Sequence, residues 1–491
     1  MSTAYTDPEI GYFPFGYVFS ELEFYFQKPD AQRFLLLEIL RKNASQTTYY
    51  LSDAPYTTSP SDTPANLQYS PVIGGTGLPG IRRTLNDPFE GSASTGFGSI
   101  TLIDRNVSTS EGVDRFESQI QTPRGAVVSA YLSGPLSLFP RSSAMPLLTG
   151  TVARSGGSSE GDVTFEITDG AEFIRNKTVN AQDFPLSFGL VRNISPKLIN
   201  PAQRIYAVHD SRIQSIDAVY DNGVLLNPSQ YSVDLLNGQF TLNQNPIGVL
   251  TADVKGAVVN SVWLQSTEDI TRELLRRSNI NSTQVYSLPI GLIGLYLNAN
   301  ELLGSILDRL MTGVAGYWLI DDLVFTAAQF PIPNSSGSIA IFTENEIIDE
   351  VTYEDDDRLY KQINYSYRNN YTLYQSAPGA SAAQATFSQL EYLQGNVQDG
   401  SPIAELEYQD SPEINTLFDE ANDAASVANR VLSIYRTPRK RLKLTVPFTS
   451  SLKLGDNIFI SFSSLEFTGA IVSIVDIFDG SYPVQELEVL A

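Results

Sequence analysis

The sequence predicts a mainly β protein with a few helices, an α+β fold, and three observations support this. Tyr and Phe number 25 each and accompany 34 Gly and 27 Pro among 491 residues, which suits many short strands joined by turns. Two Asn-Gly pairs lie inside one stretch of alternating apolar and polar residues, 216–257. Three segments have the periodicity of an amphipathic helix.

The N-terminal third is expected to form strands. Tyr17–Phe26 and Arg33–Tyr50 have strand-like patterns, and Ser52–Gly80 is a connection rich in Pro, Ser and Gly. We expect that connection to be a long exposed loop. Further strands are predicted from about Gly98, at Ala126–Leu132 and at Val163–Thr168.

The stretch 216–257 predicts an antiparallel meander. Asn222-Gly223 and Asn237-Gly238 are strong hairpin signals, because a type I′ turn requires a positive φ at both central residues. After the second pair the apolar residues alternate with polar ones. One face of that strand is expected to carry Leu250, Ala252 and Val254, and the other Thr251, Asp253 and Lys255.

Three helices are predicted. The first two are Thr267–Ser278 and Asn300–Val314, the latter with Asn300 as its N-cap. The third runs from Ser411 to Tyr435, because Ser411 suits the N-cap, a proline follows at the first helical position, and Pro438 bars continuation. Its apolar stripe is Ile414, Phe418, Ala421, Ala425, Ala428, Leu432 and Tyr435.

Composition limits the function. The chain has 55 acidic and 32 basic residues, a net charge of −23, which argues against gripping nucleic acid through its phosphates. The charge fits a solvated acidic exterior, or a surface past which DNA slides without binding. Cys is absent, so disulfides and thiolate zinc sites are excluded. Neither a secretory signal nor an apolar run long enough to span a bilayer is evident, so no integral membrane segment is expected.

Catalytic motifs fail their structural context. Gly157–Gly161 matches G-x-S-x-G, but strands flank it where a nucleophile elbow requires a following helix. Gly75–Gly80 matches G-x-G-x-x-G, but Pro79 lies where the phosphate-binding helix would begin. His209 is the single histidine, and Glu354–Asp357 lacks the spacing of a calcium loop, which favours a solvated acidic turn. We therefore predict no enzyme activity and no catalytic, cofactor-binding or metal site.

One dense basic cluster follows the third helix. Cations at the C-terminus of a helix complement its dipole, and those beyond it then lie on the next strand. The other interpretation makes the cluster a contact to an acidic neighbouring subunit or to passing DNA. The candidate subunit-contact residues are Arg436, Arg439, Lys440, Arg441 and Lys443.

Several of these passages resemble the tail hub or baseplate hub proteins of tailed bacteriophages. The meander shows VYDNGV, YSVD, GQFTL, PIG and TADVKG in that order. GSITLIDRN at Gly98–Asn106, Gly112-Val113-Asp114 and PLLTGTV at Pro146–Val152 are similar to the first domain of hubs. A helix followed by RLKLTVPFTSSLKLGDNIFIS is similar to their closing barrel. The resemblance covers most of the chain after about Pro60.

The resemblance implies a domain order, a symmetry and a place in the virion. It implies a first hub β-barrel with a long loop insertion over 1–195, a β-meander domain over 196–260, an α/β connecting domain over 261–350, and a second hub barrel over 351–491 that includes the 411–435 helix. Hubs of this family are trimers whose six barrels meet a six-fold tube. The implied protein closes the tail tube at the tail tip, after assembly in the host cytoplasm. Its implied partners are tail and tube proteins, the tape measure protein and tail fibre or tip proteins, and the genome passes through without specific binding.

A second function class stays open at this point. A β-rich glycan-binding or glycan-cleaving tail protein, an adhesin or an enzyme, would also suit the composition. Such a protein is expected to show an internal repeat or a concave face rich in exposed Trp. The chain has Trp263 and Trp318 alone and no evident repeat, which favours the hub.

Overall fold

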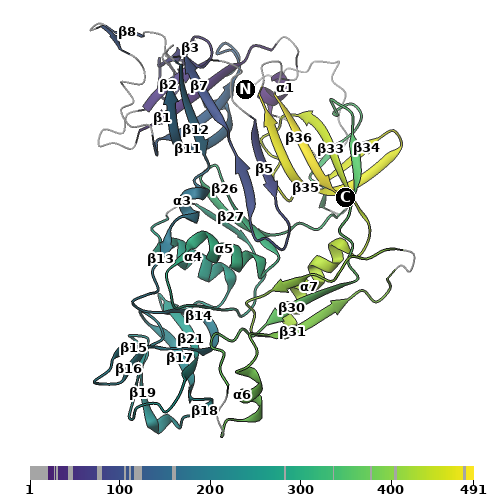
Figure 1. Ribbon diagram of the computed structural model, residues 1–491. Coiled ribbons are helices and arrows are strands. Elements are labelled where there is room, and N and C mark those ends of the chain that lie inside the picture. The colour runs from purple at the N-terminus through teal and green to yellow at the C-terminus, as the bar shows by residue number, and fades with distance from the viewer. Residues whose placement is uncertain are drawn as a thin grey trace.

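Strands dominate the computed structural model (Figure 1), which confirms the mainly β, α+β fold class. The structure describes residues 20–26, 28, 31–41, 48–74, 80–103, 107–109, 112–114, 124–157, 162–280, 283–334, 337–375, 379–402, 406–478 and 483–491. Two eight-stranded sheets lie at one end of the molecule, and smaller sheets and helices make up the rest.

The first large sheet closes into a barrel, called here the first barrel. Its strands, in order of pairing, are β2 (Thr48–Ser52), β1 (Phe34–Leu40), β10 (Val127–Ser133), β11 (Met145–Gly157), β12 (Asp162–Thr168) and β7 (Ser99–Ile103). Residues 72–74 close the ring between β7 and β2. The amide of Ile103 donates to the carbonyl of Val72 at 2.7 Å, and the amide of Ile73 to that of Ser52 at 3.0 Å.

Two predictions about the N-terminal third are wrong. Residues 21–26 form helix α1 (Glu21–Phe26) rather than a strand, because Ser20 and Glu23 cap its start reciprocally and Leu22 and Phe26, four residues apart, are both buried. Residues 17–19 lie outside the described residues. The connection after Ser52 also contains strands. These are β3 (Tyr56–Thr57) and β4 (Gln68–Pro71), and β4 pairs parallel with β2.

The second large sheet, called here the second sheet, curls around a core of its own. Its strands are β28 (Ala340–Phe342), β34 (Asn457–Phe462), β35 (Leu465–Ile477), β36 (Val484–Leu490), β33 (Arg439–Pro447) and β29 (Thr352–Asp356). A hairpin from the N-terminal third completes it. That hairpin is β5 (Ile81–Leu85) with β6 (Ala93–Gly96), and β5 pairs with β35. The division of the chain at 195, 260 and 350 stays a prediction.

The meander region divides between two sheets. The first contains β14 (Leu186–Ile194), β17 (Ile213–Asp221), β18 (Val224–Leu225), β21 (Leu250–Val259), β22 (Val262–Trp263) and β24 (Gly294–Leu297). The second contains β15 (Lys197–Asn200), β16 (Ile205–Ala207), β19 (Tyr231–Asp234) and β20 (Gln239–Leu242), beside the 3-10 turn Pro228–Gln230. Asn222 and Gly223 have φ values of 51° and 82°, which confirms the first type I′ turn. At the second pair Gly238 alone has a positive φ, and four residues join β19 to β20.

The type I′ turn gives a test of the meander. Replacing Gly223 with alanine forces a side chain into a left-handed backbone conformation, so we expect the free energy of unfolding to fall by about 1 kcal/mol. Gly156→Ala is the matched control, since an added Cβ there meets no atom within 4 Å, and its effect should stay within about 0.5 kcal/mol. Urea midpoints of the two variants measure the difference. Equal midpoints would contradict the turn assignment.

The largest hydrophobic core lies between the middle elements. The helices that contribute to it are α3 (Ala171–Arg175), α4 (Thr267–Arg277), α5 (Leu303–Thr312) and α7 (Ala421–Tyr435), whereas helix α6 (Ala382–Phe387) buries none of its residues. The strands are β13 (Thr178–Val179) with β25 (Glu301–Leu302), β23 (Gln284–Ser287) with β26 (Gly316–Asp321) and β27 (Val324–Gln329), and β30 (Gln362–Tyr367) with β31 (Leu393–Gln398) and β32 (Glu413–Asn415). The hairpin of β8 (Val107–Thr109) and β9 (Gly112–Asp114) and the 3-10 turn Arg141–Ser143 complete the described elements.

Helix α4 is confirmed, and the other two predicted helices begin later than expected. Asn300 does not cap α5; its side-chain oxygen accepts from the amides of Ala181 and Gln182, both at 3.1 Å. Helix α7 begins at Ala421, and the predicted start near Ser411 is wrong because Ile414 is fully buried in β32, which pairs parallel with β30. Tertiary pairing there overrides the local capping signal.

Candidate functional site

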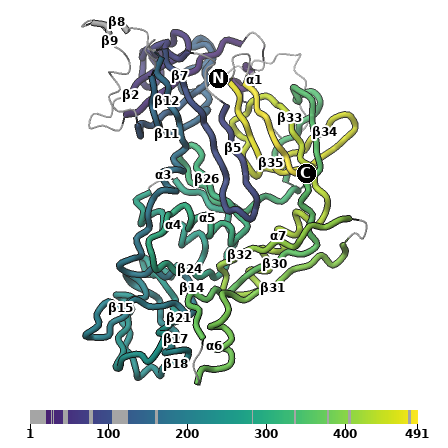
Figure 2. Tube along the Cα trace, in the orientation of Figure 1, coloured from purple at the N-terminus to yellow at the C-terminus, as the bar shows by residue number. Residues whose placement is uncertain are grey.

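The first barrel and the second sheet lie side by side at the same end of the molecule (Figures 1 and 2). Hairpin β5–β6 lies in the second sheet although it falls between strands of the first barrel in the sequence. The contacts that join these two units, together with those that hold hairpin β5–β6 in the second sheet, are called here the junction. We take the junction as the candidate functional site, because it sets the relative orientation of two barrel-like units within one chain.

Arg83 on β5 ties three segments together at the junction. Its guanidinium lies 2.6 Å from the carboxylate of Asp476 on β35 and 2.8 Å from that of Asp321 at the end of β26. The side chain of Asp476 is 2% exposed and also accepts a hydrogen bond from Gln485 at 2.8 Å. Burial raises the pKa of Asp476, and the positive charge of Arg83 opposes that rise. Asp476 therefore depends on Arg83 for its charge compensation.

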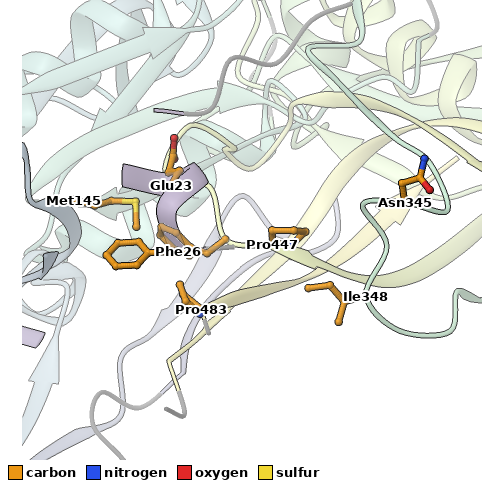
Figure 3. A pocket seen from close by; sticks show the side chains of 8 residues that line it. Glu23, Phe26, Met145, Asn345, Ile348, Pro447 and Pro483 are labelled. Atoms are coloured by element: carbon orange, nitrogen blue, oxygen red, sulfur yellow. The ribbon is translucent and has the colours of Figure 1, made fainter. Parts of the chain in front are cut away.

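A cleft of about 240 Å³ lies at the junction, and Figure 3 shows its lining side chains. On α1, the carboxylate of Glu23 accepts from the amide of Ser450 at 3.1 Å and from its hydroxyl at 3.2 Å. Phe448, at the end of β33, packs into the core of the first barrel and against Phe478, with ring centroids 5.3 Å apart. The cleft is lined by Glu23, Phe26, Met145, Asn345, Ile348, Pro447, Phe448 and Pro483.

Sequence reasoning did not identify Arg83, Asp476, Glu23 or Phe448. Arg83 lies 393 positions from Asp476 and Glu23 lies 427 positions from Ser450, while Phe448 packs into a core formed by the N-terminal third. Each stands in an ordinary local pattern. A buried charge is recognisable only when its partner is known. No local signal in the sequence points to them.

The basic cluster and the acidic run, which the sequence suggested separately, lie on adjacent antiparallel strands. In the register of β29 and β33, Asp355 lies opposite Lys440, and their charged atoms are 2.8 Å apart. Arg441 lies 2.9 Å from the carboxylate of Asp356 and also pairs with Glu488. Lys443 lies 3.8 Å from Glu354. Most of the cluster is therefore neutralised within the chain.

Asp356 is the centre of this network. Burial alone would raise the pKa of its carboxyl, but hydrogen bonds from Arg358 and Arg441 outweigh that effect and lower the pKa to about 2. Arg358 also reaches Asp87 at 3.0 Å, in the turn between β5 and β6. The network thus connects the N-terminal hairpin to the second sheet from another side.

The two remaining members of the cluster differ. Arg439 donates to the carbonyl of Ile434 at 2.7 Å, which satisfies a free acceptor in the last turn of α7. Arg436 is exposed and makes no ion pair with any described residue. The interpretation in which cations complement the helix dipole and then lie on the next strand accounts for Arg439 and its neighbours on β33. Contact with a neighbouring subunit stays a prediction, and Arg436 is the exposed member of the cluster without an ion pair to a described residue.

The other sequence candidates are structural or lie outside the described residues. His209 is fully buried, and its Nδ1 accepts from the amide of Ser187 at 2.9 Å. Residues 75–79 and 158–161, which contain most of the two glycine motifs, are outside the described residues. Within the described ranges, no three His, Asp or Glu side chains are grouped to hold a metal ion. No helix among the described residues is long and apolar enough to cross a membrane.

Comparisons with known proteins give structural neighbours without sequence relatives. No protein-family model matches the chain, and no curated protein sequence matches it. A tail protein from Neisseria meningitidis is similar at 8% identity and a TM-score of 0.46, over 93% of this chain and 96% of its own. The 43 kDa tail protein of prophage MuSo2 from Shewanella oneidensis has 10% identity and a TM-score of 0.41, over 93% and 98%. Prophage tail protein gp18 from Listeria monocytogenes has 9% identity and a TM-score of 0.39, over 92% and 94%.

At these identities and TM-scores, the activities and partners of those proteins are not transferred to this chain.

Proposed function

We propose that this chain is a structural protein of a bacteriophage virion, the hub that closes the tail tube at the tail tip. The observation that carries the proposal is the junction, where Glu23 and Phe448 join two barrel-like units side by side and Arg83 holds hairpin β5–β6 in the second sheet. The resemblance of the meander and of 441–461 to hub proteins supports it from the sequence.

A fixed pair of barrels suits a change of symmetry. Three chains with two barrels each would present six barrels to a six-fold tube, while the rest of each chain follows three-fold symmetry. This requires that the two barrels of one chain keep a constant orientation. The hydrogen bonds from Ser450 to Glu23 and the packing of Phe448 into the core of the first barrel restrict such motion. The proposed assembly is a homotrimer.

The proposed channel is acidic, so that the genome leaves without being held. The polar face of the second sheet balances Glu350, Glu486 and Glu488 with Arg82, Arg441 and Lys443, so the acidic sign proposed for the channel rests on the net charge of −23. A basic lumen would hold DNA by releasing counterions from its phosphates, whereas an acidic one would not. Double-stranded DNA binding that weakens steeply with salt would exclude this part of the proposal.

The proposal also places the chain among partners. The surfaces away from the ring would meet tail and tube proteins, the tape measure protein and tail fibre or tip proteins, after assembly in the host cytoplasm. The role is structural and requires no catalysis by this chain. Hydrolysis of peptidoglycan or polysaccharide by the purified protein, abolished by one Asp or Glu substitution, would contradict it.

Negative-stain images and native mass spectrometry of the purified chain test the ring directly. We expect trimers seen end-on as rings with a central hole and six densities around it. A compact monomer at all concentrations, or a fibrous trimer without a hole, would overturn the hub proposal.

Arg436 gives a test of the predicted subunit contact. Arg436→Glu reverses an exposed charge that has no partner among the described residues, so the chain should fold and melt as the parent does. If Arg436 meets an acidic neighbour, the fraction of trimer in native mass spectra should fall. Arg124→Glu, at another exposed arginine, is the matched control. An unchanged trimer fraction in Arg436→Glu would remove Arg436 from the interface.

A further inference from the structure

A second cleft, remote from the junction, lies where β30, β32 and the residues just before β31 meet α5. It has a volume of about 320 Å³, and its lining combines aromatic rings, amides and one charge of each sign. We propose that this cleft binds a single neutral sugar unit. The lining side chains on which the proposal rests are Arg309, Asn369, Tyr371, Glu391, Tyr392 and Asn415.

Tyr371 provides a rigid apolar wall. Its hydroxyl donates to the carbonyl of Gly294 at 2.6 Å, and its ring packs edge-on against Tyr296 with centroids 5.6 Å apart. Burial of the phenol raises its pKa to about 12, while part of the residue remains accessible from the cleft. A fixed ring of this kind suits packing against the apolar face of a pyranose. Tyr392 adds a second, partly exposed ring to the lining.

Polar groups with free hydrogen-bonding capacity surround that wall. The side chains of Glu391 and Asn415 are exposed, and neither makes a hydrogen bond to any described side chain or main-chain group. Asn369 is oriented by a hydrogen bond from its amide nitrogen to the carbonyl of Thr416 at 3.3 Å. Arg309 is held by Glu301 at 3.1 Å. Together they offer donors and acceptors to adjacent hydroxyls.

The charges of the cleft select against anions. Arg309 is already paired with Glu301, and Glu391 contributes an unpaired carboxylate, so a phosphate or a carboxylated ligand would meet repulsion without a free cation. A neutral polyhydroxylated ligand uses the carboxylate and amides as hydrogen-bonding groups instead. The volume lies at the lower end of the range for small-molecule sites, which suits one sugar unit rather than a chain.

Saturation-transfer NMR on the full-length protein tests this proposal. The probes are glucose, galactose and N-acetylglucosamine, with glucose 6-phosphate and glucuronate as anionic counterparts. We expect saturation transfer to at least one neutral sugar. Tyr392→Ala and Asn415→Ala should each weaken its binding by about tenfold or more, since one lost stacking or hydrogen-bonding contact at a small site is worth about that factor.

Tyr353→Ala is the matched control, because Tyr353 is a half-exposed tyrosine on β29 outside the cleft. It should leave sugar binding unchanged. Melting midpoints equal to that of the parent show that both cleft variants fold. Absence of transfer to every neutral sugar, transfer to the anionic sugars alone, or binding retained in both folded cleft variants would each overturn the proposal. The result does not depend on ring formation, so it is separable from the hub proposal.

Discussion

Replacing Arg83 with alanine is expected to lower the free energy of unfolding by about 3–5 kcal/mol, because it leaves a buried carboxylate without its counter-charge. Asp476 is 2% exposed and lies 2.6 Å from the guanidinium. Asp321, 30% exposed, loses a partner at 2.8 Å and can still be solvated. Most of the loss should therefore come from Asp476. Urea denaturation followed by tryptophan fluorescence and by circular dichroism measures it.

Two further variants separate this effect from a general loss of an arginine. Arg154 pairs with Glu166 at 3.6 Å, but the two side chains are 83% and 56% exposed, so Arg154→Ala should change the free energy of unfolding by less than about 0.5 kcal/mol. In Arg83→Ala combined with Asp476→Asn, the unpaired charge is gone and part of the stability should return. An Arg83→Ala variant that unfolds at the parental midpoint would show that the junction does not depend on this pair.

The features that the sequence predicted well are those governed by short-range signals. The type I′ turn at Asn222-Gly223 forms because two consecutive residues tolerate a positive φ. Helix α4 forms where a serine cap, acidic residues in the first turn and arginines in the last all agree. The mainly β fold class follows from composition and alternation. Each signal lies within a few residues of the structure that it specifies.

The failures occur where distant segments decide the structure. Ser411 and Pro412 form a good helix start, yet β32 forms there because Ile414 enters the central core beside β30. Hairpin β5–β6 lies in the second sheet because its pairing partner, β35, is almost 400 residues away along the chain. Local propensity contains no information on either partner.

The candidate site shows the same difference between short-range signals and contacts of distant segments. From the sequence alone, the acidic run at Glu354–Asp357 favours a solvated turn, and the basic cluster from Arg436 favours either cations at a helix end and on the next strand or a contact to an external partner. Their mutual neutralisation depends on the register of β29 and β33, which the sequence alone does not specify. The residues of the junction gave no signal at all, because a buried pair is defined by two positions that come together only in the fold.

Acidification should destabilise the protein through His209. Burial lowers the pKa of this imidazole from 6.5 to about 4, with Asp210 and Glu273 acting to raise it and Arg277 to lower it. Its Nδ1 accepts the amide hydrogen of Ser187, and its Nε2 lies 3.3 Å from the carboxylate of Asp210. Nε2 therefore carries the proton of the neutral ring. Protonation of Nδ1 would break the bond to Ser187.

The direction of the effect follows from where protons bind. Between pH 6.5 and about 4 the unfolded chain protonates its histidine and the folded chain does not, so stability falls as the pH falls through this window. At about 1.4 kcal/mol per pH unit, the full loss is about 3 kcal/mol. Above pH 6.5 both states hold a neutral ring and the contribution of His209 is constant.

His209→Asn isolates this contribution. An asparagine oxygen can accept from the amide of Ser187 but does not titrate, so the variant should lose the destabilisation that the parent shows between pH 6.5 and 4. Burial raises the pKa values of Asp253 and Asp476, and both residues titrate in parent and variant. Their contributions to stability cancel when the two pH profiles are subtracted. The measured quantity is the difference in urea midpoint between pH 7 and pH 4.5. If parent and variant lose stability equally over that interval, the acid sensitivity arises at other groups and protonation of His209 does not contribute to it.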